Sequence, residues 1–498
     1  MIFYPLVTGF SDSTHQIESV NQDGRCGREA AAQIGLRLIG TFPKPSIELS
    51  FMKLSVPLFK STIVAALGGL LFGFDTAVIS GTTHGLTDQY RLSPESLGIT
   101  VASALVGTLI GAALAAIPGD RYGRRDSLRG MAVLYFISAL GCAFAWDWTA
   151  LVFFRFIGGL GIGGSSVLGP MYIAEIAPAA WRGRLVGFFQ FNVVFGILLA
   201  YFSNYLLSLV GFGTSEWRWE LGVAAIPAFL FFLMLFGIPR SPRWLAEVGR
   251  IDEARSVLQM IGEENHELRL HEIVDSVTQA KALGKEALFQ KRYALPVFLA
   301  ISIGAFNQLS GINAILYYLN DIFTSAGFGR VSGNLQAVAI GGTNLIFTML
   351  AMSVIDKVGR KTLLLIGSVG TMLCLAGISA VFATQRHREL LVWLLIGYIA
   401  FFAASQGAVI WVYISEVFPN AVRAKGQSLG SFTHWAMNAL ISGVFPLLAA
   451  RSGAYPFMFF CAMMIAQFFV VLFVYPETKG ITLEDMQKRM EGAPVAHH

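Results

Sequence analysis

Charge is scarce in this sequence. Only 13% of its 498 residues are Asp, Glu, Lys or Arg, whereas 55% are hydrophobic. Soluble globular chains carry about 25% charged residues, so the composition excludes an ordinary water-soluble enzyme, a disordered chain and a coiled coil. Too little polar surface is present to cover the chain in water, and lipid is the solvent that accepts the excess apolar surface. We therefore predict a membrane protein.

Cysteine and net charge are also low. The four cysteines, Cys26, Cys142, Cys374 and Cys461, show neither disulfide spacing nor a C-x-x-C pattern, so we predict that all are unpaired and that the chain binds no metal. The 36 basic and 31 acidic residues leave a net charge of +5. A nucleic-acid partner would require a clustered basic excess, and none is expected.

Long apolar runs recur along the chain. A membrane-spanning helix needs about 20 mostly apolar residues. Twelve runs meet this requirement: 57–81, 95–118, 127–146, 149–173, 184–210, 220–239, 293–322, 332–355, 362–385, 390–415, 426–449 and 452–475. We predict an all-α membrane protein with twelve transmembrane helices.

Basic residues in the short loops predict the orientation. The even-numbered loops hold eleven Lys or Arg residues and the odd-numbered loops hold six. Because basic loops stay on the cytoplasmic side, we expect both termini in the cytoplasm and a multi-pass protein of the inner or plasma membrane.

Two stretches do not fit a membrane. Residues 240–292 are charged and helical in pattern, and they separate two domains of six spans each, 52–239 and 293–476, of which the second precedes a cytoplasmic tail, 477–498. Residues 1–51 lack the basic, apolar and cleavage regions of a signal peptide, and Met52 begins a short basic stretch that leads into the first span. Our hypothesis is that 1–51 are disordered or an over-extended start.

Three phrases occur twice along the chain, at offsets of 236 to 241 residues. Asp120-Arg-Tyr-Gly-Arg-Arg125 recurs as Asp356-Lys-Val-Gly-Arg-Lys361, Glu175-Ile-Ala-Pro-Ala-Ala-Trp-Arg182 as Glu416-Val-Phe-Pro-Asn-Ala-Val-Arg423, and Pro239-Arg-Ser-Pro-Arg243 as Pro476-Glu-Thr-Lys-Gly480. Loops that merely hold the cytoplasmic side would explain the basic residues, but neither the matching acids nor the spacing. The pattern indicates an internal repeat.

Together these phrases resemble the sugar porter branch of the major facilitator superfamily, over residues of about 54–485. The resemblance implies a monomer of two six-helix bundles, related by a pseudo-twofold axis along the membrane normal, that rock about a central substrate site. It also implies cytoplasmic ion-pair networks that break on inward opening, formed by Asp120, Arg124, Glu175, Arg182, Asp356, Arg360, Glu416 and Arg423. Arg240 replaces the Glu of the family's Pro-Glu-Ser-Pro-Arg, so a contact made by that acid is not carried over.

Three ionisable side chains lie within the cores of the spans: Asp75, Arg155 and His434. Charge at membrane depth costs several kcal/mol unless it is paired or hydrated, so each is a functional candidate. Asp75 and Arg155 both lie about 9 Å from the outer surface at 1.5 Å per residue, so their depth permits a pair. A static salt bridge is the alternative to a functional pair.

The resemblance assigns a role to this pair. Proton-coupled sugar porters carry the Asp in the same phrase, whereas facilitative glucose carriers commonly have an amide there, so Asp75 is expected to take up a proton when it separates from Arg155. His434 stands where the family commonly has an amide, and a lining role is favoured over a proton relay.

Neutral polar side chains inside the membrane suit a sugar. Its hydroxyls need amides that donate and accept, and its C–H face packs on aromatic rings. Residues that match the lining of sugar porters are Gln190, Asn307, Gln308, Asn313, Asn344, Trp411, Trp435 and Asn438. Asn307, Gln308 and Asn313 cluster only if span seven breaks near Gly311. Each amide alone could equally join neighbouring helices.

We predict a monosaccharide transporter for a hexose or pentose, such as glucose or xylose, with the proton as coupling ion and no cofactor. A uniporter without proton coupling is the alternative. Ile197 replaces a second amide of span five, which favours a smaller sugar, and Gly407-Ala408 replaces a Gly-Pro, which should relax the break in span ten. A sensor would be expected to carry a long tail, and a membrane enzyme a nucleophile, metal cluster or paired carboxylates.

Overall fold

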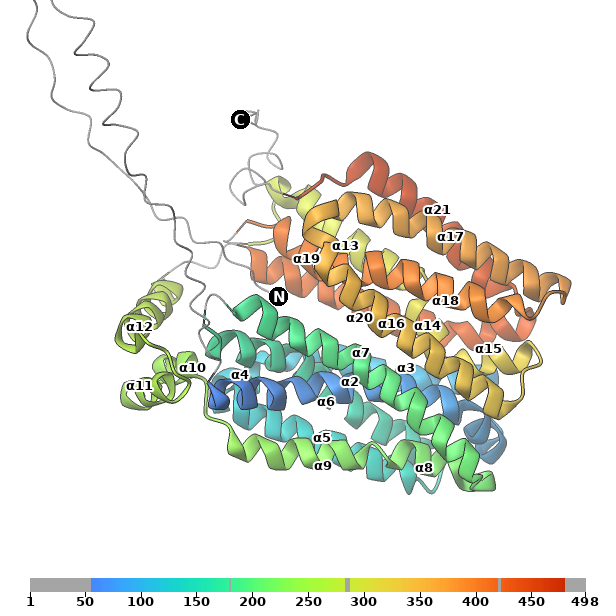
Figure 1. The fold of residues 1–498 in the computed structure, drawn as a ribbon, viewed down its shortest axis with the longest axis horizontal. Helices are drawn as coiled ribbons and strands as arrows, with labels where there is room; N and C mark the ends of the chain where they lie inside the picture. Colours follow the sequence, from blue (N-terminus) through green and yellow to red (C-terminus); the bar gives the residue numbers. More distant parts are fainter. Residues whose placement is uncertain (1–54, 179–180, 283–286, 420–421, 480–498) are drawn as a thin grey trace, which may run out of the picture. The chain divides into compact units, whose positions relative to one another are not determined.

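Helices follow one another through the residues that the computed structural model describes, 55–178, 181–282, 287–419 and 422–479, with no strand among them (Figure 1). The predicted all-α class is confirmed. The predicted N-terminal segment 1–51, Cys26 and almost all of the tail lie outside these ranges.

The first half of the chain forms six helical passes. The elements are α2 (Val56–Tyr90), α3 (Pro94–Leu114) continued by α4 (Ala116–Tyr122), α5 (Arg124–Ala143), α6 (Trp148–Ile176), α7 (Arg182–Val210), and a sixth pass made of η1 (Gly213–Ser215), α8 (Glu216–Gly222), α9 (Ala225–Met234) and η2 (Leu235–Gly237). Within this half α2 packs against α7, and α3 and α5 pack against α6.

The second half repeats the plan after a helical connection, which consists of α10 (Pro242–Glu247), α11 (Ile251–Met260), α12 (His266–Ala282) and η3 (Lys291–Tyr293). Its elements are α13 (Ala294–Leu309), α14 (Ile312–Tyr317), α15 (Leu319–Ser325), α16 (Arg330–Val358), α17 (Arg360–Thr384), α18 (Leu390–Phe402), the π-helix η4 (Ala403–Gly407), α19 (Ala408–Glu416), α20 (Arg423–Arg451) and α21 (Tyr455–Val474). Here α17 packs against α21, and α13 against α20.

Eleven stretches of the described residues are long and apolar enough to cross a membrane. The predicted third span corresponds to α5, which is not among them because four of its first six residues are charged. α5 nevertheless packs lengthwise against α6, α8 and α9. Each of the twelve predicted spans therefore corresponds to a helix or a series of helices.

Glycine explains the turn inside one of the repeated phrases and the close packing of two helices. Gly123 and Gly359 separate α4 from α5 and α16 from α17 with φ of +86° and +101°, a conformation that residues with a Cβ avoid. Gly107 and Gly159 bring α3 and α6 so close that a Cβ on Gly159 would lie 2.0 Å from the Ala104 carbonyl oxygen. Small residues allow such backbone approach between membrane helices.

We call the end of the helices that carries the Asp120–Arg125 and Asp356–Lys361 phrases the basic end, and the opposite end the far end. Polar contacts that join the two halves toward the far end are those of Thr83 with Asp321, Tyr201 with the Leu316 carbonyl, and Arg330 with Glu216. α3 and α20 also meet there, where Gly98 faces the Gly443 backbone. The two halves are thus in contact at the far end.

Candidate functional site

Asp75 of α2 and Arg155 of α6 form an ion pair in the interior of the first half. Arg155 Nη1 lies 3.5 Å from Asp75 Oδ1. The side chain of Arg155 is 4% exposed and that of Asp75 is 22% exposed. The depth argument, which permitted this pair, is confirmed. The contact is single and long, so it is weaker than a bidentate pair and well suited to separate.

The pair lines a small cavity between the two halves. The volume of the cavity is about 10 Å³, near the lower limit for one water molecule. α2 contributes Phe72 and Asp75 to its wall, and the second half contributes Tyr317 and Trp435. The rings of Phe72 and Trp435 are 5.5 Å apart between centroids. The charged pair and aromatic side chains of the other half therefore share one cavity.

A cluster of amides forms around a break in the seventh pass. α13 ends at Leu309, Gly311 has φ +88°, and α14 begins at Ile312, so the condition for clustering, a break near Gly311, is met. Gln308 lies at the centre, because its Nε2 donates to Asn307 Oδ1 at 3.1 Å and its Oε1 accepts from Asn313 Nδ2 at 3.1 Å. Asn307 and Gln308 are buried. The break thus brings three amides of one pass together.

Aromatic rings border this cluster. His434 Nε2 lies 2.7 Å from Gln308 Nε2, so the histidine nitrogen accepts from the amide. The His434 ring lies 5.2 Å from that of Trp411 and 5.0 Å from that of Trp435. Asn438, one turn further along α20, donates to the Tyr317 hydroxyl at 3.3 Å. The amide cluster is thereby connected to the cavity that holds the charged pair.

Two of the predicted lining residues stay apart from the cluster, and one partner was not predicted. Asn344 accepts from Thr348 on its own helix, and no hydrogen bond joins half-buried Gln190 to another described residue.

The unpredicted partner lies in the tenth pass. Asn307 donates to the Gln406 carbonyl at 3.4 Å, within η4. The expectation of a relaxed tenth pass is wrong, because η4 interrupts the helix without a proline. The polar triplet Ser405-Gln406-Gly407 in an apolar run was the available signal.

We expect Gly311→Ala to displace the amide cluster. The residue has a positive φ, and its Cβ would lie 2.3 Å from the Phe460 ring, so α14 must shift. Sugar binding should weaken by at least about tenfold, which corresponds to the loss of one well-placed hydrogen bond. Ligand-induced thermal stabilisation of the purified protein measures this. Gly342→Ala is the control, since a Cβ there meets nothing within 4 Å; equal binding by the two variants would contradict the expectation.

A charged cluster at the basic end joins the first set of repeated phrases. Arg124 Nε lies 3.1 Å from Glu175, and Arg124 Nη1 lies 3.4 Å from Asp120 and 3.4 Å from Glu247. Ser241 donates to the other oxygen of Glu175 at 2.5 Å. The contact with Glu247 was not predicted, because nothing in the local pattern of α10 marks it.

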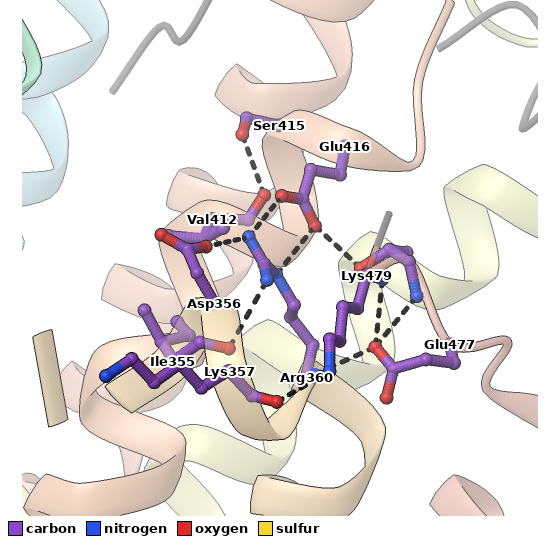
Figure 2. A network of polar contacts seen from close by, with 10 residues as sticks. Ile355, Asp356, Lys357, Arg360, Val412, Ser415, Glu416, Glu477 and Lys479 are labelled. Atoms are coloured by element: carbon purple, nitrogen blue, oxygen red, sulfur yellow. Dashed lines mark hydrogen bonds and ion pairs between the residues drawn. The ribbon is translucent and has the colours of Figure 1, made fainter. Parts of the chain in front are cut away.

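The second half holds the equivalent cluster, shown in Figure 2. Arg360 lies 2.8 Å from Asp356 and 2.9 Å from Glu416. Glu477 accepts from the backbone N–H of Arg360 at 2.9 Å, and Thr478 donates to Glu416 at 2.6 Å. All three repeated phrases therefore converge on one arginine in each half, which is the physical reason for their joint repetition.

Two arginines of the predicted network lie elsewhere. Arg182 makes no ion pair with another described residue, and its Nε has no hydrogen-bond partner there. Arg423 donates to the Phe418 carbonyl at 3.2 Å, which closes the turn before α20. The ion pairs of each cluster stay within one half of the described chain, so the clusters brace each half separately.

Arg240, the departure from the family phrase, takes part in a separate cluster. Asp126 accepts from Arg125 at 3.1 Å, from Arg129 at 2.7 Å and from Arg240 at 3.1 Å. One carboxylate thus serves three guanidinium groups from α5 and the start of the connection. Arg240 therefore has an ion-pair partner in this chain.

We expect Asp126→Asn to lower the stability of the protein. Three cations would lose their shared anion, and since the Asp126 side chain is 23% exposed, the loss should be about 1–2 kcal/mol rather than the larger cost of a fully buried pair. Thermal unfolding in detergent measures it. Asp252→Asn, which removes a 97% exposed carboxylate, should have no effect; an Asp126 variant that unfolds at the unaltered temperature would overturn the assignment.

The two halves, the buried charged pair and the amide cluster between them define a membrane transporter of the major facilitator type. The family described as "Sugar (and other) transporter" matches residues 61–490, and the chain belongs to this family.

Known proteins are similar to this chain over most of its length. The D-xylose-proton symporter of Escherichia coli (strain K12) is 38% identical over 474 residues, which cover 87% of this chain and 96% of that protein. The arabinose-proton symporter of Bacillus subtilis (strain 168) is 38% identical over 434 residues, with 85% and 93% covered. The inward open conformation of the xylose transporter XylE from E. coli superimposes with a TM-score of 0.78 at 36% identity, covering 87% of this chain and 99% of that one.

Proposed function

We propose that this protein carries a monosaccharide across the membrane together with a proton. The central observation is that the Asp75–Arg155 pair lines the same cavity as Tyr317 and Trp435 of the other half. Tyr317 in turn accepts from Asn438, and Trp435 adjoins the His434 ring that contacts the amide cluster. The proton-binding group and the sugar-binding groups are therefore neighbours, as coupling requires.

The chemistry follows from the two kinds of site. An ionised Asp75 is held by Arg155, and a protonated Asp75 has no charge for Arg155 to attract, so proton uptake loosens α2 from α6. The amides Asn307, Gln308 and Asn313 offer donors and acceptors to sugar hydroxyls, and Trp411 and Trp435 offer faces for its C–H groups. Gln190 and Asn344 would join this site in another conformation of the two halves.

Alternating access gives the two ends different roles. The far-end contacts between the halves, and the similarity to an inward open structure, support an inward-facing state. Because basic loops stay on the cytoplasmic side, the basic end is proposed to face the cytoplasm, and both termini with it. The clusters around Arg124 and Arg360 then hold each half rigid, and approach of the two halves at that end would bring them together in the outward-facing state.

The sugar is proposed to be a pentose or a hexose. The similar proteins named for xylose and arabinose favour a pentose, as does Ile197 in place of an amide, because a smaller sugar presents fewer hydroxyls.

Uptake into proteoliposomes tests the proposal. With an inward proton gradient, labelled xylose should accumulate above its external concentration, and a protonophore should return the ratio to one. A facilitative carrier would reach a ratio of one in both conditions. That result would refute proton coupling without contradicting the proposed sugar site. Counterflow with a panel of pentoses and hexoses identifies the substrate without any gradient.

A further inference from the structure

Glu220 is a buried carboxyl group outside the pair assigned to coupling. It lies on α8 near the far end, and it is 0% exposed. Neither of its carboxyl oxygens has a hydrogen-bond partner among the described residues. A buried carboxylate without a donor is costly, so this position calls for an explanation.

Asn204 of α7 is the polar neighbour of Glu220, and no hydrogen bond joins the two side chains in the described part of the chain. A Cβ built on Gly81 of α2 would lie 2.7 Å from Glu220 Oε1 and 2.5 Å from Asn204 Nδ2, so these side chains pack together over that glycine. Asn204 Nδ2 donates to the Val78 carbonyl at 3.1 Å, and Asn204 Oδ1 is unpartnered. Two unsatisfied acceptors lie side by side, and a proton on Glu220 would supply the missing donor.

The nearby charges leave Glu220 without a counterion of its own. Glu216, one turn earlier on α8, lies 3.1 Å from Arg330 Nη2 of α16. One arginine therefore faces two buried carboxyl groups, and two carboxylates that share a site cannot both ionise cheaply. Because Glu216 has the contact with Arg330, the arrangement favours a neutral carboxyl at Glu220 rather than at Glu216.

The other ionisable groups around α8 do not neutralise Glu220. On α2, His84 and Asp88 are exposed and pair with each other at 3.0 Å. Arg218 of α8 donates to the Ala143 and Ala145 carbonyls instead. The charged residues of α5 all lie in its first two turns, at the basic end, and its far end carries Cys142. On α15, Asp321 accepts from Thr83 at 3.0 Å.

We propose that Glu220 is a second proton-binding site, which takes up one proton when the far end closes. Separation of the halves admits water to the far end, and because hydration favours the ionised carboxylate, the Glu220 carboxyl releases its proton to the far side; closure buries the group again and reverses the step. This inference rests on the proposed function only in that alternating access opens the far end. External acidity would then favour closure independently of Asp75.

Distance measurements between spin labels test this proposal. The labels replace Val210 and Val331, which are 66% and 42% exposed and lie at the far end of different halves, in a chain whose native cysteines are changed to alanine. In the Asp75→Asn background, raising the pH from about 5 to about 9 should increase the ratio of open to closed molecules, by up to tenfold per pH unit for one linked proton. Adding Glu220→Gln should reduce the change to less than about twofold over the whole range.

Three comparisons complete the experiment. Glu220→Met should give the same flat profile and replaces Glu220→Gln if the latter does not fold. Glu95→Gln, an exposed far-end carboxyl, should leave the pH dependence intact. An unchanged pH dependence in the Glu220 variants would refute the second proton site. That result is distinct from failure of the proposed function, which appears as a sugar ratio of one in proteoliposomes that carry an inward proton gradient.

Discussion

Asp75→Asn is expected to abolish accumulation of sugar while sparing exchange of sugar across the membrane. The amide keeps the size of the carboxylate that contacts Arg155 at 3.5 Å, but it cannot bind and release a proton. With one proton per sugar, a gradient of one pH unit supports about tenfold accumulation, and the variant should reach a ratio of one. Proteoliposome uptake measures the ratio, and counterflow measures exchange.

The matched control for this experiment is on the same helix. Asp88→Asn removes a carboxyl group that is 69% exposed and pairs with His84 at the far end, so accumulation should be unchanged. If Asp75→Asn still concentrates sugar while a protonophore abolishes that gradient, the coupling proton binds elsewhere. If both variants lose exchange, the effect is on folding, and thermal unfolding of each variant shows it.

Gln308→Leu is expected to weaken sugar binding by about a hundredfold. Gln308 is the residue that links Asn307, Asn313 and His434, and leucine fills a similar volume without a donor or an acceptor. The change removes two hydrogen bonds to the sugar or to its neighbours, each of about 1–1.5 kcal/mol, and leaves other buried amides unsatisfied. Counterflow at increasing sugar concentration measures the apparent affinity.

Gln467→Leu provides the comparison, because Gln467 of α21 is another amide that is 2% exposed in the second half and makes no hydrogen bond with the cluster. Its replacement should alter stability but leave the affinity for sugar within about twofold, since no hydrogen bond to the sugar is lost. Equal loss of affinity in the two variants would show that any buried amide of this half has the same effect, and the assignment of Gln308 to the sugar site would be withdrawn.

The fold was predictable because hydropathy acts over short distances. Each run of about 20 apolar residues can satisfy its backbone hydrogen bonds in lipid only as a helix. This requirement alone predicted the membrane passes between α2 and α21. The third span was predicted despite the charged start of α5, because an apolar run follows that start. The break at Gly311 was also predictable, since glycine beside a cluster of amides combines a backbone that can turn with side chains that need a common partner.

The site was predictable only where a local signal existed. Asp75 and Arg155 were conspicuous as charges in apolar runs, and the resemblance selected the amides of the lining. Glu247 and the Gln406 carbonyl were missed because their partners, Arg124 and Asn307, are more than 90 residues away and the contact depends on how passes cross. The place of Arg182 in the network stays a prediction, because that network is expected in the outward-facing state.

The scarcity of charge and the long apolar runs determined, from the sequence alone, that this is a membrane protein with about twelve membrane passes. They also showed that the remaining charge collects in repeated phrases at one end. These properties depend on each residue's own preference for water or lipid. Tertiary structure decided which charges meet: it paired Asp75 with Arg155, gave Glu216 the arginine and left Glu220 with none. Such pairings depend on the crossing of helices distant in the chain, and no local preference encodes them.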